Sequence, residues 1–237
     1  MALVSAHRGG AGDDNLMENS LAACERSIAV GCDFIEFDVR RSADGHHVIF
    51  HDDLLTIDGV EQSIAASAYA LLHGIELLHL DDLLELLRGR AKAHVDLKLP
   101  GDEIDVVARI VEVLGKDNVV ITTAEDSSVR AILGWAHTDA PGLLVGLSSS
   151  ARGGGARWRD RFASWFPRTR LRRSGANLVV SNRLVARFWL RAYASRRHLP
   201  LLVWTVDSPG ELARWINDPH TWMVATNYPE RAIAARR

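Results

Sequence analysis

Residues 6–52 read AHRGGAGDDNLMENSLAACERSIAVGCDFIEFDVRRSADGHHVIFHD, and the run FIEFDV at 34–39 alternates apolar and acidic residues. A period of two is typical of a β-strand, so Glu36 and Asp38 lie on one face and the apolar side chains on the other. Two neighbouring carboxylates repel each other unless a cation or a positive side chain lies between them. Mg²⁺ and Ca²⁺ prefer oxygen ligands, so this strand predicts a site for one divalent cation.

Strand-like and helix-like segments alternate from one end of the chain to the other. The expected strands are Leu3–Ala6, Phe34–Val39, His94–Leu97, Val119–Thr122, Leu143–Leu147, Leu178–Ser181, Leu201–Thr205 and Trp222–Ala225, with a short extra strand at His47–Phe50. The expected helices are Ser20–Val30, Asp81–Leu87, Glu103–Leu114, Ser127–Trp135, Arg157–Arg172, Leu184–Arg196 and Gly210–Ile216, with a brief one within Pro229–Arg237. Eight strands that alternate with helices predict an α/β fold, a closed (β/α)₈ TIM barrel.

The barrel is expected to form a single domain over residues 1–237, with a short insertion after the second strand. A barrel of this kind commonly takes about 200–250 residues. The chain is 47% hydrophobic, which is ordinary for a globular protein with a full-sized core. An open doubly wound sheet is the structural alternative, but no glycine-rich nucleotide-binding motif follows an expected strand.

The cellular compartment can be predicted from the cysteines and the apolar runs. Cys24 and Cys32 have no metal-ligand spacing, so we interpret them as reduced core residues of a reducing compartment. The opening MALVSAHRGG enters the first strand at once and leaves no room for a signal peptide. No run of the sequence is long and apolar enough to span a membrane. We therefore expect a cytoplasmic protein.

The net charge of −2 hides an uneven distribution of charge. Residues 151–237 contain 17 Lys and Arg against 5 Asp and Glu, so the first 150 residues carry the acidic excess. Within the basic part, the segment 157–173 (RWRDRFASWFPRTRLRR) has a helical stripe of aromatic residues. It is interpreted either as an outer helix of the barrel or as a peripheral contact with an anionic membrane. We expect no nucleic-acid partner and no obligatory protein partner.

Polar residues follow the expected strands at their carboxyl ends. His7 and Arg8 follow the first strand, and Glu36 and Asp38 end the second. Asp96 and Lys98 are at the end of the third strand, and further polar residues are at the ends of the later strands. Active sites of TIM barrels lie at this end of the strands, so these residues are expected to share one site.

The chain contains the motifs His7-Arg8-Gly9, Glu18-Asn19-Ser20, Ile35-Glu36-Phe37-Asp38-Val39, Asp44-Gly45 and His51-Asp52, followed by Asp96-Leu97-Lys98, Val203-Trp204-Thr205-Val206-Asp207 and Thr226-Asn227-Tyr228-Pro229. These motifs resemble those of the glycerophosphodiester phosphodiesterase family. They match in order and approximate spacing over nearly the whole chain, although residues 100–175 contribute little. The resemblance implies a TIM-barrel enzyme that hydrolyses glycerophosphodiesters to glycerol 3-phosphate and an alcohol with one divalent cation, Mg²⁺ or Ca²⁺.

The resemblance also implies roles for the acidic and basic residues. Glu36, Asp38 and Asp96 would be the metal ligands, although the family usually has Glu where Asp96 stands. Lys98 and Arg8 would bind the phosphate of the substrate. Asp207 stands where the family commonly has Asn, and Asn227 where it commonly has Asp.

Two histidines, His7 and His51, are expected to transfer the protons of the reaction. Displacement at phosphorus needs a base for the attacking oxygen and an acid for the leaving alkoxide, and imidazoles titrate near neutral pH. We assign His51 as base and His7 as acid, although the sequence alone does not separate the roles. Attack by water and attack by a neighbouring glycerol hydroxyl, which forms a cyclic phosphate, are both open.

Three further residues are expected to contact the substrate or to orient the site. Glu18 either orients Arg8 or a histidine, or caps the helix that follows, and Asn19 either touches phosphate or metal, or caps that helix. Trp204 either forms a wall of the substrate pocket, as the family pattern suggests, or belongs to the core. His94 shares a strand face with Asp96, so it is the other histidine that could belong to the site.

The expected substrate is a small-molecule or lysolipid glycerophosphodiester. A short insertion after the His51-Asp52 motif leaves the mouth of the barrel open, so we expect a bulky or lipid-like arm to be admitted. Lysophospholipase D or sphingomyelinase D-like activity is one alternative. A catalytically silent barrel that binds phosphodiesters or lipid head groups is another.

Overall fold

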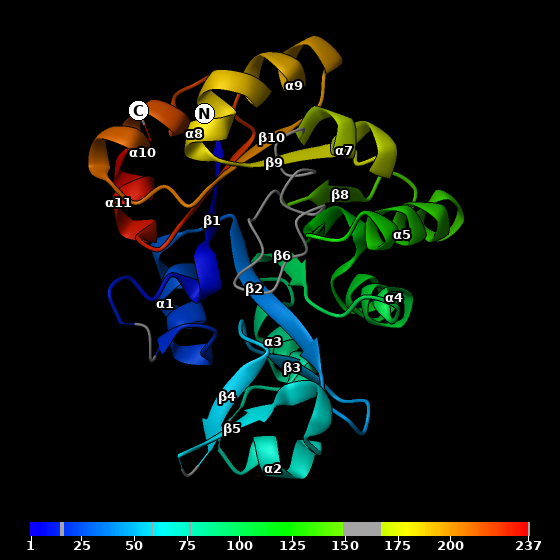
Figure 1. Ribbon diagram of the computed structural model, residues 1–237. Helices are drawn as coiled ribbons and strands as arrows, with labels where there is room; N and C mark the ends of the chain where they lie inside the picture. Colours follow the sequence, from blue (N-terminus) through cyan, green and yellow to red (C-terminus); the bar gives the residue numbers. More distant parts are fainter. Residues whose placement is uncertain (15–16, 58, 76, 149–166, 237) are drawn as a thin grey trace.

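Eight parallel strands close into a barrel in the computed structural model, which describes residues 1–14, 17–57, 59–75, 77–148 and 167–236 (Figure 1). The strands are β1 (Leu3–Ala6), β2 (Phe34–Arg41), β6 (Lys92–Leu97), β7 (Val119–Thr123), β8 (Leu144–Leu147), β9 (Leu178–Asn182), β10 (Leu201–Trp204) and β11 (Met223–Thr226). They pair in the order β1-β11-β10-β9-β8-β7-β6-β2, and β1 pairs with β2 to close the ring. The TIM-barrel prediction is confirmed.

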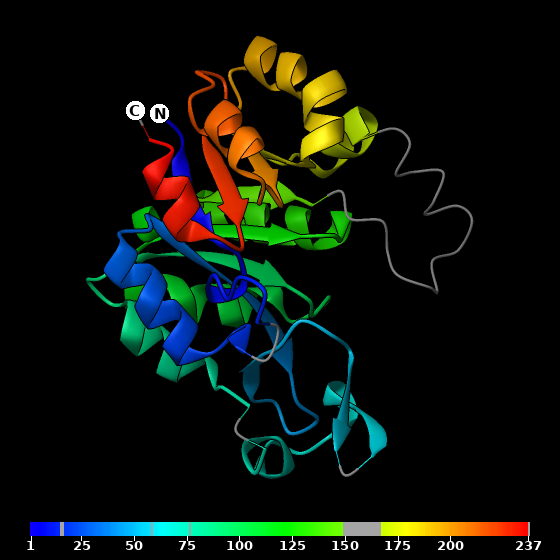
Figure 2. The ribbon, with the colours of Figure 1, turned by 90° about the vertical axis from the view of Figure 1, so that its left-hand side faces the viewer.

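Helices connect the strands and surround the barrel (Figures 1 and 2). They are α1 (Leu21–Val30), α3 (Leu80–Leu87), α4 (Glu103–Leu114), α5 (Asp126–Asp139), α7 (Pro167–Ser174), α8 (Arg183–Val185), α9 (Arg191–Arg197), α10 (Pro209–Ile216) and α11 (Pro229–Ala234). Short 3₁₀ turns lie at His7–Gly9 (η1) and Lys116–Asn118 (η4), and a π-helical turn, Ala186–Leu190 (η5), joins α8 to α9. No described helix is both long enough and apolar enough to cross a lipid bilayer.

The alternation of side chains along each strand separates two buried cores. Outward-facing residues such as Ile35, Phe37 and Val95 pack under the helices in the larger core. The interior of the barrel is filled by a smaller cluster of inward-facing residues, Phe34, Val120, Leu178, Val180, Leu202, Met223 and Ala225. Further along β2, the inward-facing positions become acidic, so the apolar interior forms the floor of a polar mouth.

An insertion between β2 and α3 carries the remaining strands (Figure 1). It contains β3 (His47–Ile49), which pairs antiparallel with the end of β2, a hairpin of β4 (Leu54–Ile57) and β5 (Val60–Ser63), the 3₁₀ turn η3 (Ile64–Ala66), and α2 (Tyr69–His73). Five buried residues give the insertion a small core of its own: Val48, Leu55, Ile57, Ile64 and Leu72. The sequence did not predict the hairpin, because four-residue strands are too short to show a clear period.

The expected element boundaries differ from the observed ones at the strand and helix ends. The second strand reaches Arg41 and not Val39, because pairing with β3 extends it. The predicted helix Leu184–Arg196 is interrupted by the π-helical turn. Of the predicted helix Arg157–Arg172, residues 157–166 lie outside the described part of the chain, and the following residues form α7.

Candidate active site

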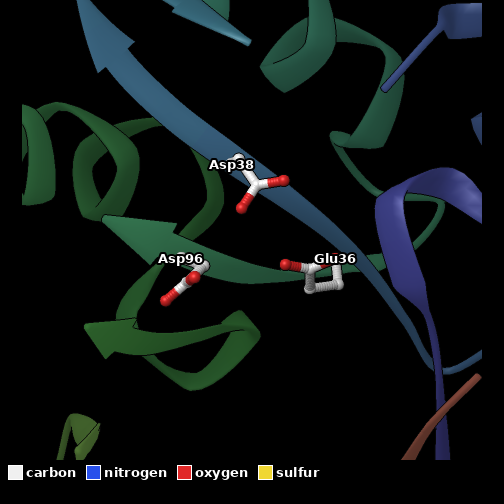
Figure 3. Close-up of side chains that lie close together, drawn as sticks. All are labelled: Glu36, Asp38 and Asp96. Carbon is white, nitrogen blue, oxygen red and sulfur yellow. The ribbon is translucent and has the colours of Figure 1, made fainter. Parts of the chain in front are cut away.

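Three carboxylates converge at the mouth of the barrel (Figure 3). Glu36 and Asp38 project from β2 and Asp96 from β6, where Asp96 pairs in register with Asp38. One oxygen from each of the three lies within 4.8 Å of the others. The shorter side chain of Asp96 therefore still reaches the cluster. An all-oxygen donor set with this spacing fits a hard divalent cation such as Mg²⁺ or Ca²⁺.

The charges of the cluster are strongly coupled. Burial of Glu36, together with the like charges of Asp38 and Asp96, raises the pKa of its carboxyl well above the usual value. Burial would raise the pKa of Asp38 too, but the positive charges of Lys98, His51 and Arg8 outweigh it and lower that pKa. A bound cation would relieve the repulsion among the three acids, so this electrostatic environment supports the metal assignment.

Lys98 lies between the two aspartates. Its Nζ is 3.2 Å from Asp38 Oδ1 and 2.5 Å from Asp96 Oδ2. Burial disfavours the ammonium, but these two carboxylates outweigh that effect and raise the pKa of Lys98. The Thr122 hydroxyl on β7 donates to Asp96 Oδ1 at 2.9 Å. Lys98 is therefore charged, and it is held at the wall of the pocket by the same acids that would hold a cation.

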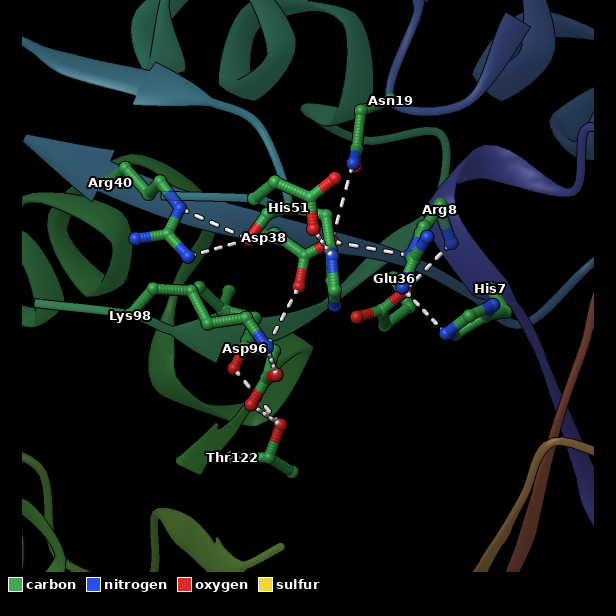
Figure 4. Close-up of polar contacts among 12 residues, drawn as sticks. His7, Arg8, Asn19, Glu36, Asp38, Arg40, His51, Asp96, Lys98 and Thr122 are labelled. Carbon is green, nitrogen blue, oxygen red and sulfur yellow. Dashed lines mark hydrogen bonds and ion pairs between the residues drawn. The ribbon is translucent and has the colours of Figure 1, made fainter. Parts of the chain in front are cut away.

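The turn after β1 brings Arg8 into the site (Figure 4). Arg8 has a left-handed backbone with φ 47°, and its N–H donates to Glu36 Oε2 at 2.6 Å. Its Nη1 donates to Glu18 at 2.7 Å, and its Nε lies 3.6 Å from Asp38. A positive φ is costly for a non-glycine residue, and the contacts with Glu36 and Glu18 hold the strained turn in place. Of the two expectations for Glu18, the structure shows the contact with Arg8.

Asn19 also enters the site with a left-handed backbone, at φ 58°. Its Nδ2 donates to Asp38 Oδ2 at 3.2 Å, and its buried Oδ1 has no hydrogen-bond partner among the described residues. The cap of α1 is supplied by Ser20, whose Oγ accepts from Ala23 N. Capping therefore does not explain Asn19 or Glu18, and the structure instead places both in contact with residues of the site.

His7 is held by Asn227, which is itself held by Asp207. Its Nδ1 lies 2.7 Å from Asn227 Oδ1. The Asn227 amide nitrogen donates to Asp207 at 3.0 Å, so its oxygen faces His7 and can only accept. The proton of neutral His7 is therefore on Nδ1 and the lone pair on Nε2, which lies 4.0 Å from Glu36. Burial lowers the pKa of His7, so the neutral form is favoured.

His51 approaches the site from the loop between β3 and β4 (Figure 4). Its Nδ1 lies 2.8 Å from Asp52 Oδ1, and its side chain is 38% exposed. Its backbone carbonyl accepts from Arg40 Nε at 3.0 Å and Nη2 at 2.6 Å, and the same guanidinium pairs with Asp53. Arg40 thus ties the loop that carries His51 to the rigid strand that carries the acids.

One pocket of about 100 Å³ connects these residues. It is lined by His7, Arg8, Glu36, Asp38, His51, His94, Asp96, Lys98, Thr122, Ser148, Val180, Leu202, Trp204 and Ala225. Glu18 and Asn19 lie behind this lining, in contact with Arg8 and Asp38. Trp204 faces the pocket and its indole nitrogen is buried without a hydrogen-bond partner among the described residues. The structure therefore brings every predicted site residue to this pocket or into contact with its lining.

Two polar residues of the site, Ser5 and Arg40, were not named from the sequence, and two more, Thr122 and Ser148, were placed at strand ends without a role. Arg40 had a detectable signal, because it continues the period of two after Glu36 and Asp38 on the same strand face. Thr122 and Ser148 ended expected strands but belonged to no motif. Ser5 gave no signal, since it is a small residue within a buried strand.

His94 is a buried neutral histidine beneath the site. Its Nδ1 lies 3.0 Å from Ser5 Oγ and its Nε2 3.3 Å from Thr122 Oγ1. Burial lowers its pKa to about 3, with a smaller contribution from His7 when that ring is protonated. These contacts make it a structural support of the strand that carries Asp96.

Acid should therefore destabilise the protein through His94. Below pH 6.5 the unfolded chain binds a proton at this residue that the folded protein does not bind until about pH 3. Stability is thus lost as the pH falls through this window, by about 1.4 kcal/mol per pH unit from this one group. Urea unfolding in EDTA between pH 6.5 and 4 should show this extra slope in the wild type and not in His94→Gln. Equal slopes in the two proteins would contradict the assignment.

The fold and site together define a class, the TIM-barrel proteins with a cluster of carboxylates beside histidines at the strand ends. Within that class, the chain belongs to the glycerophosphoryl diester phosphodiesterase family, whose model matches residues 7–127.

Individual relatives agree with this assignment. The chain is 27% identical to a glycerophosphodiester phosphodiesterase of Caldanaerobacter subterraneus over 61% of its length and 65% of the relative's. It is 28% identical to the mouse lysophospholipase D GDPD3 over 58% of its length and 47% of the relative's. The chain thus spans about two thirds of the first protein and about half of the second.

Solved structures share the fold. A glycerophosphodiester phosphodiesterase from Agrobacterium tumefaciens superposes with a TM-score of 0.76 at 20% identity, covering 99% of both chains. A phosphodiesterase from Oleispira antarctica, solved with the product sn-glycerol-3-phosphate, has a TM-score of 0.70 at 21% identity, covering 99% of this chain and 96% of its own.

Proposed function

We propose that the protein is a metal-dependent phosphodiesterase that hydrolyses glycerophosphodiesters to glycerol 3-phosphate and an alcohol. The observation that carries this proposal is the convergence of two histidines, His7 and His51, with three carboxylates in one pocket. The family assignment and the two relatives support the same chemistry. A protein that only bound phosphodiesters would have no use for a paired acid and base.

Glu36, Asp38 and Asp96 would hold the divalent cation. When bound there, the cation would neutralise charge that develops on the phosphoryl oxygens. Arg8 and Lys98 supply further positive charge for the phosphate, and Glu18 orients Arg8. Trp204 offers an apolar wall and a free indole N–H on the other side of the pocket.

The contacts of the two histidines favour His7 as the base and His51 as the acid. Neutral His7 carries its lone pair on Nε2, toward the acid cluster, so it can accept the proton of the attacking hydroxyl. The Asp52 carboxylate, 2.8 Å from His51 Nδ1, can orient this ring for proton transfer to the leaving alkoxide. This division of roles is the reverse of the first assignment made from the sequence.

A direct assay tests the proposed reaction. The protein is incubated with glycerophosphocholine, a lysophospholipid or sphingomyelin in Mg²⁺ or Ca²⁺, and the released alcohol is measured. Release from glycerophosphocholine supports the proposal, whereas release from the lipids alone favours the lysophospholipase D or sphingomyelinase D alternative. Binding of glycerophosphocholine without release under any metal would favour the silent barrel.

Replacement of Arg40 should slow the reaction without weakening substrate binding. Arg40→Met removes two hydrogen bonds from the His51 carbonyl, so the loop no longer holds the imidazole in place. We expect kcat to fall by about 10- to 100-fold with KM nearly unchanged, because misplacement of a catalytic group is costly. Addition of methylguanidinium should restore part of kcat. The matched control is Arg41→Met, which breaks a pair with exposed Asp102. A change confined to KM would contradict the positioning role.

A further inference from the structure

The helical segment after β9 presents apolar side chains to solvent. Leu184, Phe188 and Trp189 are 53%, 70% and 58% exposed. Phe188 and Trp189 belong to the π-helical turn η5, whose neighbouring residues Ala186 and Leu190 are completely buried. The turn is therefore anchored, and its exposed rings are a fixed feature of the surface. Exposed apolar groups on an anchored element indicate an interaction site.

Arginines lie on the same segment and beside it. Arg183 and Arg187 lie exposed on the same segment, and Arg187 lies over the Phe188 ring at 5.5 Å. Among the described residues, no carboxylate forms an ion pair with either arginine. Arg168 of α7 reaches the same place and donates to the Trp189 carbonyl at 2.6 Å. We call Arg183, Leu184, Arg187, Phe188 and Trp189 the aromatic–arginine surface.

This surface lies on the mouth side of the barrel. The segment begins directly after Asn182, the last residue of β9, and Val180 on that strand lines the pocket. In Figure 1, α8 lies on the side of the barrel opposite the insertion with β4, β5 and α2. A flat partner that contacts the aromatic–arginine surface would therefore face the rim of the site.

We propose that the aromatic–arginine surface docks on an anionic lipid membrane. Aromatic rings partition into the boundary between head groups and acyl chains, and arginines bind lipid phosphates while their stems cover apolar surface. Arginines without carboxylate partners fit a surface of many phosphates better than a protein patch of mixed charge. This docking does not depend on the proposed hydrolysis and is a separate property of the surface. It would bring lysolipids in the membrane close to the pocket.

Vesicle sedimentation tests the docking. The protein of residues 1–237 is mixed with vesicles of phosphatidylcholine alone, or with phosphatidylglycerol added, at low and high salt. We expect binding only to the anionic vesicles, weakened by salt. The Phe188→Ser/Trp189→Ser and Arg183→Ser/Arg187→Ser variants should each bind about tenfold less. The control, Leu21→Ser/Arg26→Ser, removes one exposed leucine and one exposed arginine from α1 and should bind normally.

The readouts separate docking from catalysis and folding. Turnover of glycerophosphocholine and the melting temperature should stay unchanged in both surface variants, because their residues lie outside the pocket. Equal binding by wild type and the Phe188/Trp189 variant, or no binding of anionic vesicles by the wild type, would overturn the inference. A wild type that binds vesicles but hydrolyses no glycerophosphodiester would overturn the proposed function alone.

Discussion

His51→Ala should lower kcat for glycerophosphocholine by about 10²–10⁴-fold, the usual contribution of a general acid or base. Choline leaves as an alkoxide that needs a proton, and His51 is the half-exposed imidazole whose Nδ1 is held by Asp52. With a p-nitrophenyl ester of glycerol phosphate, the leaving group needs no proton, so most of the loss should disappear. Steady-state kinetics with both substrates measures this difference.

His7→Ala should behave differently from His51→Ala. If His7 is the base, it is needed whatever group leaves, so its loss should be equally large with both substrates. The control is His137→Ala, an exposed histidine of α5, which should have no effect. If the p-nitrophenyl substrate restored activity to His7→Ala but not to His51→Ala, the two histidines would have the opposite roles. Full activity in both variants would exclude the histidine mechanism.

Removal of the cation should abolish activity. Replacement of the ligand Glu36 should stabilise the protein without the cation and should reduce the stabilisation that the cation gives. We expect EDTA to lower the rate by at least about 10³-fold, with recovery in Mg²⁺ or Ca²⁺. Glu36→Gln removes one of three clustered charges but keeps an oxygen to accept the Arg8 N–H. In EDTA, this variant should therefore be more stable than the wild type, by on the order of 1 kcal/mol.

The cation should stabilise the wild type more than the variant. A ligand at 100 times its Kd adds about 2.7 kcal/mol to folding stability, so the melting temperature of the wild type should rise with Mg²⁺ or Ca²⁺. Glu36→Gln should show a much smaller rise, and Glu61→Gln, an exposed position on β5, should match the wild type. Equal rises in all three proteins would show that the cation does not bind at Glu36.

Much of the fold could be predicted because periodicity is a local property. The alternation in residues 34–39 and the regular succession of strands and helices were enough for the barrel, and the boundaries of β1 and α4 matched the prediction. The hairpin of β4 and β5 was missed because its strands are short and are stabilised by a small core of distant residues. The interrupted helix after β9 was missed because nothing in the segment 184–196 signals a π-helical turn.

The site shows where prediction from sequence stops. Residue types and their positions at strand ends were enough to name the acids, the two histidines, Arg8 and Lys98 as one group. The pairing of Asp207 with Asn227, and of Asn227 with His7, joins residues 220 positions apart in the chain. That pairing sets the tautomer of His7, and it joins the three residues in one connected hydrogen-bond chain.

By itself, the sequence determined which residues share a strand face and which end of each strand carries polar groups, because both follow from the two-residue period. Only the tertiary structure decided the charge states, since burial and distance set them. Glu36 is protonated more easily than Asp38, although both lie on the same face of the same strand. The difference comes from Lys98, His51 and Arg8, which closure of the barrel and the loop after β3 bring closer to Asp38.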